Sequence, residues 1–162
     1  MNYPMLVTLV AALMSAGPAF DPAHDATGFF QTVAGSWTGE GELFGQEAEF
    51  AMDWQFELGR KFATLDYSIR GQRSMDAVAY YRMSESASLE GVWFDSRGEI
   101  LHLEATVTDS TLTTIWRSPT EKGRTTYQLQ GESIHVNDYY RDGEDWALFG
   151  QARYTRDGPH PG

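Results

Sequence analysis

The sequence predicts an all-β protein, an antiparallel up-and-down barrel of about ten strands with one short N-terminal helix. Apolar residues occupy every second position from Ala48 to Leu58, a period of two that a helix cannot keep while burying one face. Strand-like segments then recur about every dozen residues, separated by short links rich in glycine and aspartate. Such links join antiparallel neighbours, and a long run of hairpins avoids exposed edges most economically by closing on itself.

The expected helix precedes the barrel. Asp25–Thr27 offers an N-cap, Phe29, Phe30 and Val33 follow at helical spacing, and Gly35 ends the segment. The expected strands are Ser36–Phe44, Glu47–Leu58, Lys61–Arg70, Met75–Met83, Leu89–Asp95, Glu99–Val107, Ser110–Ser118, Gly123–Gln130, Ser133–Arg141 and Asp145–Arg156.

The amino terminus has the composition of an export signal. The segment Met5–Ala16 is an apolar run with small residues mixed in, no Asp, Glu, Lys or Arg precedes Asp21, and small residues occupy 16–19. The apolar run is shorter than a transmembrane helix and matches a signal-peptide core, although its flank lacks Lys and Arg. We therefore expect a signal peptide over 1–19, a barrel domain over 20–156, a flexible tail over 157–162, and a periplasmic or secreted protein.

Composition excludes several functions. The formal net charge is −11, which repels nucleic acid phosphates and anionic lipid, so neither a nucleic acid nor a membrane is an expected partner. The chain has no cysteine, which rules out disulfides, thiolate metal sites and a cysteine nucleophile.

Two short motifs carry a family resemblance. Gly35–Glu42 reads GSWTGEGE, and Tyr154–Arg156 ends the last expected strand. With Leu58–Lys61 and Gly91–Gly98, these motifs resemble the calycin superfamily, and within it the nitrobindin-like barrels and an uncharacterised bacterial lipocalin-like family. The resemblance implies a ten-stranded barrel of the lipocalin or fatty-acid-binding-protein kind.

Trp37 and Arg156 are expected to close the barrel. Trp37 opens a glycine-rich first strand and is large enough to plug the end that the helix seals. Arg156 ends the strand that would pair with it, so its guanidinium can lie on the indole face.

The resemblance raises haem as a cofactor, and the sequence disfavours it. Nitrobindins place an axial histidine on the last strand, whereas Trp146–Tyr154 has none and Phe149 stands at the ligand position. We expect no haem and no other cofactor.

The sequence also gives no metal or catalytic motif. The four histidines are scattered, and His102 and His135 alone could meet across strands, too few ligands for zinc. There is no nucleophile elbow and no phosphate loop.

Some polar residues lie an even number of positions from apolar ones along the same expected strand, so the two share a face. His102 is in phase with Ile100, and Asp138 with Val136. Arg117 follows Ile115 and Arg82 follows Val78 in the same way. The pattern within one strand does not decide which face is the inner one.

The expected function is binding of a small, mainly hydrophobic molecule inside the barrel. Its expected lining is Phe50, Met52, Trp54, Phe56, Tyr81, Trp93, His102 and Trp116. One alternative is an enzyme of the isomerase, cyclase or lyase kind, favoured if His102 or His135 faces the interior beside an arginine. Another is a filled barrel that acts through its outer surface. Ligand identity and oligomeric state are left open.

Overall fold

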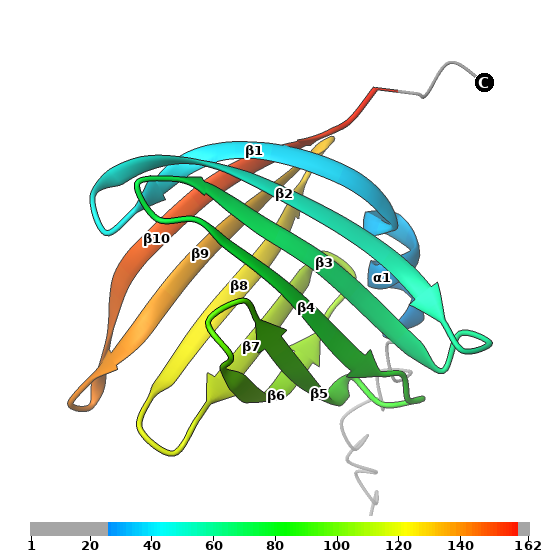
Figure 1. Cartoon of the computed structure of the whole chain (residues 1–162). Coiled ribbons are helices and arrows are strands. Elements are labelled where there is room, and N and C mark those ends of the chain that lie inside the picture. The colour runs from blue at the N-terminus through cyan, green and yellow to red at the C-terminus, as the bar shows by residue number, and fades with distance from the viewer. Residues whose placement is uncertain (1–25, 159–162) are drawn as a thin grey trace, which may run out of the picture.

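A computed structural model describes residues 26–158, which form ten antiparallel strands and one helix (Figure 1). The elements are α1 (Thr27–Val33), β1 (Gly35–Leu43), β2 (Gln46–Glu57), β3 (Phe62–Gly71), β4 (Met75–Arg82), β5 (Ser88–Asp95), β6 (Ile100–Val107), β7 (Thr111–Arg117), β8 (Lys122–Gln130), β9 (Ser133–Asp142) and β10 (Asp145–Arg156).

The strands follow one another around a closed barrel, each hydrogen-bonded to the next along the chain. Closure comes from β1, which pairs with both β2 and β10, so that Trp37 is opposite Arg156 and Leu43 is opposite Gly150. Every strand edge is thereby paired. The predicted all-β barrel of about ten strands with one helix is confirmed.

Most strand ends differ from the expected ones by a single residue, and the β1–β2 turn shows why. Phe44 and Gly45 both have positive φ, 51° and 73°, as the two central residues of a type I′ hairpin require. The strand was expected to end at Phe44. The tight hairpin instead ends β1 at Leu43.

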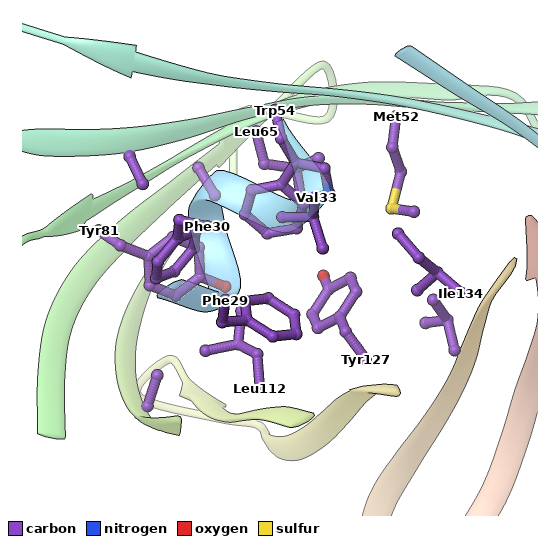
Figure 2. Packing of buried hydrophobic residues seen from close by; sticks show 14 of the residues in the cluster. Phe29, Phe30, Val33, Met52, Trp54, Leu65, Tyr81, Leu112, Tyr127 and Ile134 are labelled. Carbon is purple, nitrogen blue, oxygen red and sulfur yellow. The ribbon is translucent and has the colours of Figure 1, made fainter. Parts of the chain in front are cut away.

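Helix α1 packs into one end of the barrel and fills it. Its N-cap residue is Ala26, which makes no side-chain capping bond, so burial rather than capping holds the helix in place. Phe29, Phe30 and Val33 are at most 2% exposed. Figure 2 shows these three side chains among inward-facing residues of many strands, including Trp54, Leu65, Tyr81, Leu112 and Tyr127.

The two ends of the barrel therefore differ. The β1–β2, β3–β4, β5–β6, β7–β8 and β9–β10 turns surround the end opposite α1, which we call the open end (Figure 1). Inward-facing Trp93 and Trp116 near this end keep part of their surface exposed.

At the carboxyl end, the described chain continues past β10 and hydrogen-bonds to β1. The expected signal peptide, 1–19, and residues 159–162 lie outside the described residues. Asp157, assigned to the tail, hydrogen-bonds to β1: its amide donates to Ser36 O (3.0 Å), and its carboxylate accepts from Thr38 Oγ1 (2.9 Å). Within residues 26–158, no helix is long and apolar enough to cross a membrane.

Candidate ligand-binding site

A carboxylate lies on the inner face of the barrel toward its open end. Along β9, Ile134 and Val136 are buried in the barrel core, and Asp138 continues on the same face. On β10 the residue opposite Asp138 is Gly150, next to an irregularity in the strand at Leu148–Gly150. Asp138 is not fully covered, so its carboxylate combines an interior position with access from outside.

Asp138 is held by a chain of hydrogen bonds from two neighbouring strands. The Trp116 Nε1–H of β7 donates to Thr125 Oγ1 of β8 (3.2 Å), and Thr125 Oγ1 donates to Asp138 Oδ1 (2.5 Å). Because the indole nitrogen is a donor only, the threonine hydroxyl accepts from it and turns its own proton toward the carboxylate. The other carboxylate oxygen, Oδ2, has no hydrogen-bond partner among the described residues.

The surroundings of Asp138 weaken it as an acid. Burial raises the pKa of Asp138 to about 6, and the hydrogen bond from Thr125 offsets only part of that rise. No Arg, Lys or His in the described part of the chain forms an ion pair with Asp138. An inner carboxylate thus stands without a protein counter-charge.

Three tyrosines of the interior are affected by the charge of Asp138. Burial, with smaller contributions from neighbouring groups that include Asp138, raises the pKa values of Tyr67, Tyr127 and Tyr154 well above the ordinary value. All three stay neutral at physiological pH. The buried Tyr154 hydroxyl makes no hydrogen bond of full geometry among residues 26–158, but the neighbouring Tyr67 side chain acts on it as a hydrogen-bond partner and offsets part of the rise in its pKa.

Aromatic rings surround this polar group and extend to the rim of the open end. Tyr67 lies 5.5 Å from Trp93, measured between ring centroids. Phe149 lies 6.4 Å from Trp116 and stacks on Phe44 at 4.9 Å, and Phe44 is itself 55% exposed. The Trp116 indole, which reaches Asp138 through Thr125, thus joins the carboxylate to the aromatic side chains of the open end.

Two glycines make the arrangement possible. A Cβ at Gly123 would collide with the indole of Trp116, so this ring lies directly over the β8 backbone on its way to Thr125. A Cβ at Gly150 would come within 3.2 Å of Asp138 Oδ2 and 3.1 Å of Leu43 Cδ1. Both positions thus leave room beside the groups of the site.

Asp95 provides an internal contrast. It also belongs to the inner face near the open end, on β5, but its carboxylate is bound by Arg97 Nη2 (2.7 Å) and by Trp93 Nε1 (3.1 Å). Burial acts to raise the pKa of Asp95, yet the hydrogen bonds from Arg97 and Trp93 bring it below the ordinary value. The protein satisfies one inner carboxylate with its own cation and leaves the other without one.

The residues expected to line a cavity divide between the two ends. Phe50 lies beside Tyr67 and Tyr154, and Trp93 and Trp116 belong to the open end. Met52, Trp54 and Tyr81 are at most 2% exposed and belong to the packed core around α1 (Figure 2). Phe56 lies near the end of β2, with the guanidinium carbon of Arg60 at 4.0 Å from its ring centroid.

The prediction that His102 lines the interior is wrong. On β6 the buried residues are Leu101, Leu103, Ala105 and Val107, so His102 alternates outward and is exposed. It lies opposite Arg117 on the outer face. The phase of His102 with Ile100 was right, but this pair occupies the solvent face.

His135 alternates with buried Ile134 and Val136, so it also points out of the barrel. Strands β7 and β8 separate it from His102. The geometry that would favour the enzyme alternative, an inward histidine beside an arginine, is therefore not formed by either residue. Among residues 26–158, no three His, Asp or Glu side chains are grouped as a metal site requires.

At the helix end, Trp37 and Arg156 lie against each other. Trp37 is 2% exposed, and its Nε1–H donates to Val33 O (2.8 Å). The guanidinium carbon of Arg156 is 4.2 Å from the Trp37 ring centroid. The same guanidinium donates to Ala34 O (2.6 Å) and Thr32 O (2.7 Å), so it also caps the carboxyl end of α1.

Sequence reasoning missed the partners that define the site. The alternation that places Asp138 on the same face as Val136 was a sequence feature that pointed to this carboxylate. No sequence feature distinguished Thr125 or Tyr67 from other strand residues. They meet Asp138 only because β3, β8 and β9 all face one interior.

Comparison with models of protein families found none that matches this chain, and comparison with curated proteins found no match either.

Proposed function

We propose that the protein is an exported, lipocalin-like barrel that binds a small, mainly hydrophobic molecule through its open end. One observation carries this proposal. Inward-facing aromatic side chains are buried under α1 at one end, but at the open end Trp93 and Trp116 stay partly exposed, as does Phe149 beside Trp116. An apolar surface that faces into a barrel and remains exposed is what a hydrophobic ligand would cover.

The rim supports the same proposal. Phe44 and Phe149 stack, and Tyr140 lies 6.1 Å from Phe149, so the entrance itself is aromatic. Tyr140 is 43% exposed and Phe44 is 55% exposed. A hydrophobic molecule that approaches the open end meets apolar surface before it reaches the interior.

A titration with N-phenyl-1-naphthylamine, a neutral dye that fluoresces in apolar surroundings, tests the proposal. We expect saturable binding of one dye per chain. Trp116→Ala should weaken binding by about tenfold or more, since it removes a large aromatic contact.

Trp146→Ala is the matched control. Trp146 lies against Arg124 and Arg141 and is not part of the open end's aromatic group, so its removal should leave dye affinity unchanged. Absence of saturable binding in a folded protein, or equal losses in both variants, would overturn the proposal. Circular dichroism spectra of the variants establish that each remains folded.

A further inference from the structure

The open end contains a second recognition element besides its aromatic surface. Asp138 is an inner carboxylate without a protein cation, and its Oδ2 has no hydrogen-bond partner among the described residues. A buried charge without a counter-charge is destabilising, so such a group is usually paired or has a role of its own.

We propose that Asp138 binds the protonated amine of the ligand, so that the molecule taken up by this barrel is a small hydrophobic amine. This inference rests on the proposed function and specifies the chemical class of the ligand. The ammonium group would donate to Asp138 Oδ2, while the apolar part of the ligand contacts the aromatic side chains of the open end.

The hydrogen bonds on Asp138 favour a donor as the ligand group. Thr125 already donates to Oδ1, and Trp116 fixes the direction of that bond. Both carboxylate oxygens of the ionised group act as acceptors, so the free one requires a donor. An ammonium group supplies both the donor and a positive charge opposite Asp138, whereas a ligand carboxylate and Asp138 would repel each other.

The buried Tyr154 hydroxyl is an independent observation in the same interior. It makes no hydrogen bond of full geometry among residues 26–158, and its polar neighbour in this interior is the Tyr67 side chain. A phenol oxygen accepts from an ammonium more weakly than an ionised carboxylate does, but an ammonium has three donors to share. Tyr154 is therefore a secondary acceptor in the same interior as Asp138, whose charge acts on it.

The aromatic surroundings and the overall charge agree with a cation. Trp116, Trp93 and Tyr67 belong to the same interior, and aromatic rings attract ammonium groups through their quadrupole. The formal net charge of −11 raises the local concentration of cations around the protein. No Arg or Lys of the described chain is bound to Asp138 to compete for the same place.

The test uses three probes that share one alkyl chain: n-octylamine, 1-octanol and octanoate. Displacement of N-phenyl-1-naphthylamine from the full chain at about pH 8 gives the affinity of each. We expect octylamine to bind about tenfold more tightly than octanol, and octanoate to bind most weakly. Asp138→Asn should remove the advantage of the amine and leave octanol affinity unchanged.

Glu42→Gln is the charge control. Glu42 is exposed on the outer face of β1, so its substitution removes the same unit of charge without touching the interior. It should leave the amine advantage in place. If Glu42→Gln and Asp138→Asn act equally, the preference for amine comes from the overall field of the protein, and the assignment to Asp138 is overturned.

The pH dependence of octylamine binding gives a second test. The titratable groups that interact with Asp138 are Tyr67, Tyr127 and Tyr154, and their raised pKa values keep them neutral throughout. Octylamine affinity should therefore fall below about pH 6, where Asp138 takes up its proton, while octanol affinity stays constant.

The two proposals fail in different ways. If octanol and octylamine bind equally, and Asp138→Asn changes neither affinity, the amine inference is wrong while the hydrophobic site stands. If the dye and all three probes fail to bind the folded protein, the proposed function itself is wrong.

Discussion

Asp138 and Asp95 occupy the same inner face near the same end of the barrel, and their surroundings shift their acidity in opposite directions. Burial raises the pKa of Asp138 to about 6, while Arg97 and Trp93 outweigh burial and lower the pKa of Asp95. Asp95 accepts hydrogen bonds from Arg97 and from Trp93, whereas Asp138 accepts one from the neutral Thr125. Asp95 contributes to holding the β5–β6 turn, where its side chain also accepts from the amide of Arg97 (2.9 Å). Asp138 joins β9 to β8 and β7 through Thr125 and Trp116, but no cation among the described residues is bound to it.

This difference predicts the effect of Asp138→Asn on stability. The folded state binds the proton of Asp138 more tightly than the unfolded chain does, so the wild-type protein loses stability as pH rises from about 4 to about 6. The asparagine carbonyl can still accept from Thr125, and it carries no charge. Above about pH 7 the variant should therefore be more stable than wild type, by up to about 2–3 kcal/mol.

Urea unfolding at about pH 8 and about pH 4 measures both halves of this prediction. The advantage of the variant should be large at the higher pH and close to zero at the lower one. A variant that is less stable than wild type at both values would show that the Asp138 carboxylate stabilises the fold in its ionised form.

Gly123→Ala tests the close packing of Trp116 on β8. The added methyl would collide with the indole, so the ring must move away from Thr125. We expect a loss of about 1–3 kcal/mol in the free energy of unfolding, as for other overpacked positions. The measurement is urea unfolding followed by far-ultraviolet circular dichroism.

Gly28→Ala serves as its control. Gly28 lies in α1 with open space around it, so the same change there should be neutral or stabilise the helix by up to about 1 kcal/mol. Equal effects at the two glycines would mean that Trp116 does not depend on the missing side chain of Gly123.

Single residues were only partly predictable, and His102 and Asp138 show where the limit lies. Both were in phase with an apolar neighbour, Ile100 and Val136 respectively. Ile100 is 59% exposed, whereas Val136 is 3% exposed. Alternation gives two faces, but only the positions of the adjacent strands decide which face is inside. Thus the same pattern gave a wrong prediction for His102 and a correct signal for Asp138.

At the scale of elements, α1 is tied to the strands that close the barrel. Arg156 of β10 stacks on Trp37 of β1 and hydrogen-bonds to the last carbonyls of the helix. Trp37 in turn donates to Val33 O. Three elements from opposite ends of the described chain are thus joined by two side chains.

A double-mutant cycle measures this junction. Trp37→Ala should cost about 3–5 kcal/mol, because it removes a large buried aromatic side chain. Arg156→Ala should cost about 1–2 kcal/mol, from the lost stacking and the loss of the caps on Ala34 and Thr32. The double variant should lose less than the sum of the two. Strictly additive losses would mean that the two side chains act independently.

The elements themselves were the most predictable part of the molecule. The period-two pattern of β2 and the turn residues between later strands located all ten strands within one or two residues. The β1–β2 turn was displaced because Phe44 adopts a positive φ that its residue type disfavours. That φ is imposed by the hairpin between paired strands, which the local sequence does not reveal.

The whole molecule follows from closure. Because β1 pairs with β10, residues at the two ends of the described chain share the core, and Phe50 of β2 comes within 6.1 Å of Tyr154 of β10. The sequence indicated closure through short links and many strands. It did not indicate that the helix would fill one end and leave the other partly exposed, since that depends on where α1 docks.

We expect residues 1–19 to be dispensable for folding and for ligand binding. Among the described residues the core begins at Ala26, so a chain that starts at Phe20 retains every residue of the barrel, of α1 and of the open end. Its free energy of unfolding and its affinity for N-phenyl-1-naphthylamine should both match those of the full chain. If 1–19 is a signal peptide, protein isolated from the periplasm or medium of its native host should have its amino terminus within a few residues of Phe20, as mass spectrometry can show. An intact Met1 on cytoplasmic protein would contradict export, and a destabilised shorter chain would show that the first residues belong to the fold.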